Sequence, residues 1–295
     1  MKFIVIVNPF SGKKQGLEIF NKIKQKFDSK HIDLTLIKTE FPGHAERIIK
    51  ECNFENYNGI LMIGGDGTFH EIVNGMFNRR DKKKIPIGII PGGTGNSFML
   101  DLGIIDPNDA VDRILLNKTR FVDIIKLDMG QTVKYSINLV GWGMITDIGL
   151  TAENLRWMGN ARYTISAIIH IFFKNDRKAK FEVNGKRSVN NYMFVIGCNS
   201  INVGKGMRMA PKAKLDDGLM DIIVVDSNIS RLRLLSVLPK LFNGTHIDEP
   251  EVQYYQSKKF SLIPDNDDSL IIDGEMIGKT PIIAEIIPGS VEIYA

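Results

Sequence analysis

The sequence predicts an α/β domain built on a mostly parallel sheet, followed by an antiparallel β-sandwich or barrel. Up to about residue 125, short apolar runs alternate with stretches in which apolar residues recur every three or four positions, the pattern of βαβ units. Beyond about residue 128, short strands separated by Gly, Asn and Asp take over. We therefore place the domains at 1–128 and 129–295, and the sequence leaves open whether the last strand, 291–294, returns to the first domain.

The elements of the first domain follow in order along the chain. Its strands are expected at 3–7, 32–37, 60–63, 87–90 and 121–127. Its helices are expected at 14–27, 43–51, 68–77 and 108–115. In the first helix, the spacing of Leu17, Phe20, Ile23 and Phe27 predicts one buried face.

The second domain is expected to contain many short strands and two helical patches. The strands are expected at 192–197, 219–225, 259–263, 270–272 and 282–286. The helical patches lie at 154–173 and 230–242, and their apolar residues suit an acyl-chain pocket, a bilayer contact or, most often, an ordinary core.

Composition excludes several functional classes. The 295 residues carry a net charge of +4, too small a bias to predict a nucleic acid partner, although it permits contact with an anionic membrane surface. Two cysteines are too few for a disulfide framework, which favours a cytoplasmic protein. No apolar stretch reaches the ~18 residues that a membrane-spanning helix needs, so any membrane association is expected to be peripheral. The sequence leaves open whether the protein forms a homodimer.

A glycine loop at 64–68, Gly-Gly-Asp-Gly-Thr, follows the apolar run 60–63 and leads into a helical pattern. Glycine lets the backbone approach phosphate oxygens, and a helix N-terminus adds free N–H groups, so this loop predicts a phosphate site. An anionic Asp66 is unfavourable there unless it binds a metal ion, orients a ribose or accepts a proton. We therefore interpret Asp66 as a chemical residue, the alternative being a simple helix cap.

Two further loops have the same position relative to a strand. Pro-Gly-Gly-Thr-Gly-Asn at 91–96 follows the strand 87–90, and Asn-Pro-Phe-Ser-Gly-Lys at 8–13 follows the strand 3–7. Because ligands of open parallel sheets bind at the carboxyl ends of the strands, we expect the three loops to share one edge.

These three motifs, in this order and spacing, resemble the diacylglycerol kinase catalytic-domain family, which includes sphingosine, ceramide and bacterial lipid kinases. Matches at 211–221 and at Asp-Gly-Glu 273–275 extend the resemblance over essentially the whole chain. The resemblance implies a Rossmann-like ATP-binding domain followed by a β-sandwich lipid-binding domain. It also implies phosphorylation of a lipid hydroxyl, with ATP and Mg²⁺.

Carried over residue by residue, the resemblance implies a set of ATP contacts and two Mg²⁺ sites. The implied ATP contacts are Asn8, Thr39, Gly64, Gly65, Asp66, Gly67, Thr68, Phe69, His70, Thr94 and Glu275, the last reaching the phosphates or their Mg²⁺. Asp123 matches an acid that helps to hold the magnesium network through water, although alone it looks like a strand-terminal Asp. A structural Mg²⁺ is implied near Lys214, Asp217 and Leu219, where Asp-Asp-Gly would also make a good turn.

Two acids are candidates for the catalytic base, and the sequence does not decide between them. The sphingosine kinases point to the Asp of the glycine loop, here Asp66, and the bacterial diacylglycerol kinases point to the Asp of Asp-Gly-Glu, here Asp273. Phosphoryl transfer needs a carboxylate close to the attacking hydroxyl. We hypothesise that Asp66 is the base, and that Asp273 and Glu275 shape the metal and phosphate end.

The substrate prediction favours a sphingoid long-chain base. The segments 8–14, 39–45, 141–147 and 155–163 resemble those of sphingosine and long-chain-base kinases, in which the residue matching Asp147 contacts the substrate's amino group. The alternative is that Asp147 caps its helix or pairs with Arg156 or Arg162. Ser97 stands where diacylglycerol kinases commonly have Asp, which makes a diacylglycerol-type site less secure; diacylglycerol or another glycerolipid is the alternative substrate.

Two other classes are more distant. NAD kinase shares the Gly-Gly-Asp-Gly-Thr loop, but it should show a Thr-Gly-Ser-Thr-type motif where this chain has 91–96. A non-catalytic nucleotide- or lipid-binding regulator would be favoured by loss of Asp66, Asp273 or Glu275, and all three are present.

Overall fold

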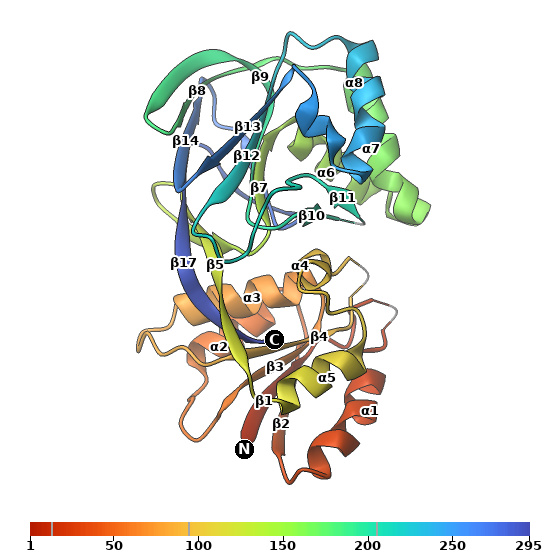
Figure 1. Ribbon diagram of the computed structural model, residues 1–295, viewed down its shortest axis with the longest axis vertical. Coiled ribbons are helices and arrows are strands. Elements are labelled where there is room, and N and C mark those ends of the chain that lie inside the picture. The colour runs from red at the N-terminus through yellow and green to blue at the C-terminus, as the bar shows by residue number, and fades with distance from the viewer. Residues whose placement is uncertain (13, 94, 205) are drawn as a thin grey trace. The chain divides into compact units, whose positions relative to one another are not determined.

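The computed structural model describes residues 1–12, 14–93, 95–204 and 206–295. They form two compact units, unit 1 with Met1–Asp123 and Gly289–Ala295, and unit 2 with Ile124–Pro288. The division falls within two strands, β5 (Thr119–Asp128) and β17 (Ile282–Tyr294), which each run from one unit into the other (Figure 1). The last residues of β17 therefore belong with the first part of the chain.

Unit 1 is built on a parallel sheet with the strand order β4-β3-β1-β2. These strands are β1 (Lys2–Val7), β2 (Asp33–Lys38), β3 (Gly59–Gly64) and β4 (Ile87–Pro91). The end of β17 lies beside β4, where Ile293 pairs with Ile87 in the parallel direction. Strands β3 and β4 are buried along their whole length, which explains why their sequences are continuous apolar runs.

Five helices accompany this sheet in the described part of unit 1. They are α1 (Gly16–Asp28), α2 (His44–Glu51), α3 (Asp66–Phe77), α4 (Ser97–Asp101) and α5 (Pro107–Leu115). Helix α1 packs against α5, and α2 packs against α3, the two pairs lying on opposite sides of the sheet in Figure 1. Phe20, Ile23 and Phe27 are buried, as their spacing predicts, whereas the short helix α4 was not predicted.

Unit 2 is dominated by antiparallel strands, as the sequence predicts. Its central strand is β9 (Lys186–Cys198), which pairs with β7, β8 and β12. The other strands are β6 (Val133–Ser136), β7 (Leu139–Gly143), β8 (Arg177–Val183), β10 (Asn202–Val203), β11 (Met207–Arg208), β12 (Met220–Asp226), β13 (Val252–Ser257), β14 (Lys259–Pro264), β15 (Ser269–Ile272) and β16 (Glu275–Lys279). The order along the sheet is β16-β15-β7-β9-β8-β14-β17.

Helices of unit 2 pack around a core of their own. They are α6 (Met144–Asn154), η1 (Arg156–Ala161), α7 (Arg162–Phe172), α8 (Arg231–Val237), η2 (Leu238–Phe242) and η3 (Thr245–Asp248), η being a 3₁₀ helix. The helical patch predicted at 154–173 is divided into η1 and α7, because Gly159 within η1 adopts φ 57° and ψ −124°. Met144, Ile171 and Leu234 form part of the helical core, while Trp142 and Phe181 belong to a separate core of the strands.

Candidate active site

Three loops meet at the carboxyl end of the parallel sheet in unit 1. The backbone N–H groups of Gly92 and Gly93 donate to the carbonyl oxygen of Gly64, at 2.8 and 3.1 Å. The Ser11 hydroxyl donates to the Gly92 carbonyl at 3.2 Å. Since β1, β3 and β4 are adjacent and parallel, the prediction that their loops share one edge is confirmed.

The glycines of these loops have two different roles. A Cβ on Gly93 would lie 2.6 Å from the Cα of Gly65, so this glycine lets the two loops pack directly on each other. Around Gly67, by contrast, the described residues place no atom within 4 Å of the position of a Cβ, apart from the adjoining residues and backbone of α3 itself. Gly67 is exposed in the first turn of α3, and α3 begins without a side-chain cap. The N–H groups of this turn are therefore suited to a phosphate.

Asp66 connects the first glycine loop to the second. Its carboxylate accepts hydrogen bonds from the backbone N–H groups of Ser97 at 2.6 Å and Phe98 at 3.2 Å. Ser97 and Phe98 are the first residues of α4, so Asp66 caps a helix of the neighbouring loop. The carboxylate is thereby held at the junction of the two loops.

The residues that the resemblance assigned to ATP differ in how far they are buried. The side chains of Thr68, Phe69 and His70 are buried, and Phe69 packs against Phe98 with ring centroids 4.9 Å apart. Gly65, Asp66 and Gly67 are partly or fully exposed.

The other implied ATP contacts lie on neighbouring loops. The side-chain amide of Asn8 donates to the Thr68 hydroxyl at 3.4 Å. The Thr39 N–H donates to the Val7 carbonyl, and the Thr39 side chain is buried. Thr94 lies outside the described residues.

Glu71 is a residue of this edge that the sequence reasoning missed. Its two carboxylate oxygens accept hydrogen bonds from the backbone N–H groups of Gly43 at 2.8 Å and Ala45 at 3.0 Å. Glu71 thus fixes the N-terminus of α2 to α3, next to the loop that begins at Thr39. A signal was present, because Glu71 sits on a largely buried helix without a basic residue three or four positions away.

In unit 2, Asp273 is bound tightly by a neighbouring turn. Its carboxylate accepts hydrogen bonds from the Ser136 hydroxyl and from the N–H groups of Ile137, Asn138 and Leu139, at 2.7 to 3.0 Å. Asp273 itself adopts φ 51°, in the turn between β15 and β16. Glu275 follows at the start of β16 with an exposed side chain.

The acids proposed to hold Mg²⁺ lie in different settings. Asp123 is 1% exposed, and its carboxylate accepts the N–H of Gly289 at 2.7 Å, both residues belonging to unit 1. Asp217 accepts the N–H of Leu219 at 3.0 Å, which is the turn that its sequence also suggested, and the side chains of Asp217 and Lys214 are exposed. Among the residues that the structure describes, no group of three or more His, Cys, Asp or Glu side chains could hold a metal ion.

Asp147 lies in the first turn of α6 and forms a two-point ion pair with Arg177 of β8. The oxygen–nitrogen distances are 2.8 and 3.0 Å. Arg177 Nε also contacts Asp268 at 2.8 Å. Partial burial alone would lower the pKa of Arg177, but the hydrogen bonds and charges of Asp147 and Asp268 outweigh it and raise that pKa. The expected alternative partner Arg162 instead contacts Glu153, at 3.8 Å.

The chain matches known proteins over nearly its whole length. Residues 2–127 match the family described as diacylglycerol kinase catalytic domain, and residues 138–295 match the YegS C-terminal NAD kinase beta sandwich-like domain. Sphingosine kinase 1 of Arabidopsis thaliana is 29% identical over 94% of this chain and 69% of its own. Diacylglycerol kinase of Staphylococcus aureus is 31% identical over 94% of this chain and 87% of its own.

A solved structure supports the same fold. The crystal structure of a diacylglycerol kinase from Bacillus anthracis superposes with a TM-score of 0.74 at 22% identity, over 99% of this chain and 96% of that one. The two domain matches and the 31% identity to a bacterial relative agree with this fold. The chain therefore belongs to the diacylglycerol kinase catalytic-domain family of lipid kinases.

Proposed function

We propose that the protein transfers the γ-phosphate of ATP to a hydroxyl of a sphingoid long-chain base. The observation that carries the ATP half of this proposal is the junction of three loops at one sheet edge, with the exposed first turn of α3 open at Gly67. Residues 1–128, together with the end of β17, then act as the ATP-binding domain, and residues 129–288 act as the lipid-binding domain.

The exposed parts of the glycine loop are the proposed phosphate contacts. Gly65 and Gly67 offer backbone N–H groups, while the buried Thr68, Phe69 and His70 support the loop from inside unit 1. The exposed carboxylate of Glu275 has the hard oxygen donors that Mg²⁺ prefers, and it is the proposed magnesium contact. Mg²⁺, when bound, neutralises charge on the phosphates.

Asp66 is the proposed general base, which accepts the proton of the lipid hydroxyl. Hydrogen bonds from N–H groups stabilise a carboxylate's charge and weaken it as a base. Asp273 accepts three such bonds and one more from the Ser136 hydroxyl, all within the turn 136–139, which suits a structural acid. Asp66 is partly exposed and is the first residue of the turn of α3 that carries the proposed phosphate contacts, so its position favours proton transfer.

The charge around Asp147 supports an amino substrate. Asp147 and Asp268 carry two negative charges and Arg177 carries one positive charge, so the cluster has a net charge of −1. The three side chains are 19 to 27% exposed, which leaves part of the cluster accessible. An ammonium group beside this cluster would complete its charge balance.

Diacylglycerol is the second candidate substrate, and a specific observation favours it. Both oxygens of Asp147 already accept hydrogen bonds from Arg177, as expected of a purely structural ion pair. The relative from Staphylococcus aureus is a diacylglycerol kinase. A glycerolipid has no ammonium group and would leave this pair intact.

The deciding experiment measures transfer of labelled γ-phosphate from Mg-ATP to acceptors in mixed micelles. The panel contains sphingosine, phytosphingosine, ceramide, diacylglycerol and monoacylglycerol, with NAD as a soluble acceptor. Preference for the free amino bases, lost in Asp147→Asn, supports the long-chain-base proposal. Preference for diacylglycerol, retained in Asp147→Asn, replaces it with the second candidate. Phosphorylation of NAD alone contradicts both, and ATP binding without any transfer would indicate a non-catalytic regulator.

The proposed enzyme meets its substrate at the surface of a membrane. None of the helices in the described parts of the chain has the length and apolar character to span a bilayer. Since a long-chain base or diacylglycerol resides in a bilayer, we propose a cytoplasmic enzyme that associates peripherally.

A further inference from the structure

Three large apolar side chains are exposed where the end of α7 meets the start of α8. Phe172 is 58% exposed, Phe173 is 71% exposed and Leu232 is 81% exposed. Together with Lys174 and Arg231 we call them the α7–α8 tip. Large apolar side chains that are exposed side by side commonly mark an interaction surface.

Two polar contacts hold the two segments of the tip side by side. Arg231 Nε donates to the carbonyl oxygen of Phe172 at 3.1 Å, which also satisfies a carbonyl at the C-terminal end of α7. Lys174 Nζ donates to the carbonyl oxygen of Ser227, in the loop before α8. Both cations are therefore fixed next to the exposed apolar side chains.

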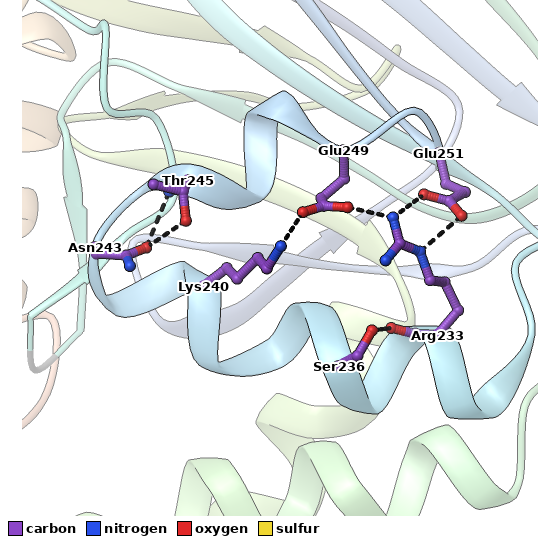
Figure 2. A network of polar contacts seen from close by, with 7 residues as sticks. All are labelled: Arg233, Ser236, Lys240, Asn243, Thr245, Glu249 and Glu251. Carbon is purple, nitrogen blue, oxygen red and sulfur yellow. Dashed lines mark hydrogen bonds and ion pairs between the residues drawn. The ribbon is translucent and has the colours of Figure 1, made fainter.

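Helix α8 is anchored by its opposite side. Arg233 lies between Glu249 and Glu251, and Lys240 contacts Glu249, as Figure 2 shows. Leu234 is buried in the helical core. Because residues two positions apart in a helix point about 200° apart, this anchoring leaves Leu232 facing outward. The tip is thus presented by a fixed support.

The tip carries excess positive charge. The five residues of the tip include two cations, Lys174 and Arg231, and no acid. The exposed Asp176, two positions after Lys174, reduces the net charge to +1, while Asp226 is partly buried and accepts a hydrogen bond from Gln253. The nearby cations Arg233 and Lys240 are balanced by Glu249 and Glu251. Apolar side chains beside cations complement an anionic lipid surface, in which acyl chains lie beneath phosphates.

We infer that the α7–α8 tip docks the protein onto an anionic bilayer, with Phe172, Phe173 and Leu232 inserted and Lys174 and Arg231 on lipid phosphates. The choice of a bilayer rests on the proposed lipid-kinase function. A second copy of the chain is a poorer partner, because a two-fold contact would bring Lys174 and Arg231 of one copy close to the same cations of the other.

The test is co-sedimentation of the full chain with vesicles that hold no acceptor lipid, in the absence of ATP. Binding is then independent of which lipid is phosphorylated. Vesicles of phosphatidylcholine alone are compared with phosphatidylcholine containing phosphatidylglycerol. The variant Phe173→Ser with Leu232→Ser is expected to bind at least about tenfold more weakly to both, because it loses most of its insertable apolar area.

The charge variants give a different signature. Arg231→Gln and Lys174→Gln are each expected to weaken binding about fivefold on anionic vesicles at low salt, with little effect on neutral ones. Leu116→Ser and Val189→Ser are matched controls, because their side chains are 66 and 59% exposed elsewhere, and they should bind as the parent does. Activity on a dispersed short-chain acceptor should be the same in all of these variants.

Several outcomes would overturn the proposal. Parent protein that does not sediment with anionic vesicles contradicts it, even if the enzyme phosphorylates lipids in micelles. So does equal binding by the tip variants and the controls. A tip variant that loses activity on the dispersed acceptor would place the tip in the active site. A tip variant that binds vesicles as the parent does but has a different molecular mass by light scattering would make the tip a contact between copies.

Discussion

The carboxylate of Asp66 accepts the backbone N–H of Ser97 at 2.6 Å. The backbone at position 97 therefore links the second glycine loop to Asp66, a contact that any residue other than proline at this position can make. From the sequence, Ser97 in place of the Asp common in diacylglycerol kinases makes a diacylglycerol-type site less secure. In the structure Ser97 is the first residue of α4 and is buried.

The two candidate bases should respond differently to removal of charge. Asp66→Asn is expected to lower kcat by about 10²–10⁴-fold with a folded protein and a nearly unchanged KM for ATP, as for loss of a general base. Asp273→Asn is expected to lower stability by about 1–3 kcal/mol, because an amide N–H₂ would face N–H donors of the turn 136–139. Steady-state kinetics and denaturant unfolding of both variants check this. Near-full activity in Asp66→Asn would reject Asp66 as the base.

Replacing one glycine of each kind with alanine tests the two roles of the loop glycines. Gly93→Ala should destabilise unit 1 and abolish activity, because its Cβ would lie 2.6 Å from the Cα of Gly65. Gly67→Ala has open space around its Cβ and should fold normally with a raised KM for ATP. Thermal melts and ATP kinetics of the pair check the prediction. A normal KM in Gly67→Ala would show that phosphates bind elsewhere.

Glu71 is predicted to be a positioning residue for ATP. Glu71→Gln replaces one of the two oxygens that accept the N–H groups of Gly43 and Ala45, at a cost of about 1 kcal/mol. We expect KM for ATP to rise several-fold while kcat changes little, measured at saturating lipid. Glu18→Gln, which loses an exposed pair with Lys22, is the control. A lowered melting temperature with normal ATP kinetics would make Glu71 purely structural.

His246 is predicted to make stability depend on pH. Burial lowers the pKa of this imidazole, which is 2% exposed and bonded through Nε2 to the Met209 carbonyl. The unfolded state binds a proton near its usual pKa of about 6.5, whereas the folded state does not until lower pH. The contribution is therefore complete above about pH 6.5 and falls by at most about 1.4 kcal/mol per pH unit below it.

The measurement for His246 is urea unfolding at a series of pH values from neutral to acidic. His246→Asn removes this titration, so the free energy of unfolding of the variant should vary less with pH than that of the parent. Groups other than His246 cancel in the comparison. Parallel curves for parent and variant would contradict the assignment.

The parallel part of the fold follows from local rules. The strands β1, β3 and β4 are apolar runs that end in glycine or asparagine turns, and each of these signals lies within one short segment. The break at Gly159 was missed, because apolar periodicity continues on both sides of a glycine whose left-handed φ is visible only in the structure. Helix α4 was missed because its five residues are too few for a periodic pattern.

The sequence predicts which residues belong to the site better than it predicts their hydrogen-bond and ion-pair partners. The motifs identified Asp66, Asp147 and Asp273 as unusual acids, but each accepts hydrogen bonds from residues distant in sequence. Arg177 lies 30 positions after Asp147 and could not be distinguished by sequence from the basic residues on the solvent-facing side of β8. Long-range pairing of this kind depends on the register of β8, which the sequence pattern does not specify.

The path of β17 sets an order on how the protein can be made. The edge of β4 that pairs with Ile293 belongs to unit 1, yet its partner is synthesised only after all of unit 2. While the ribosome is still translating unit 2, that edge is unpaired and open to wrong pairing. The nascent first unit thus depends on completion of the second, and a translational pause late in the chain should expose it to aggregation or to chaperones.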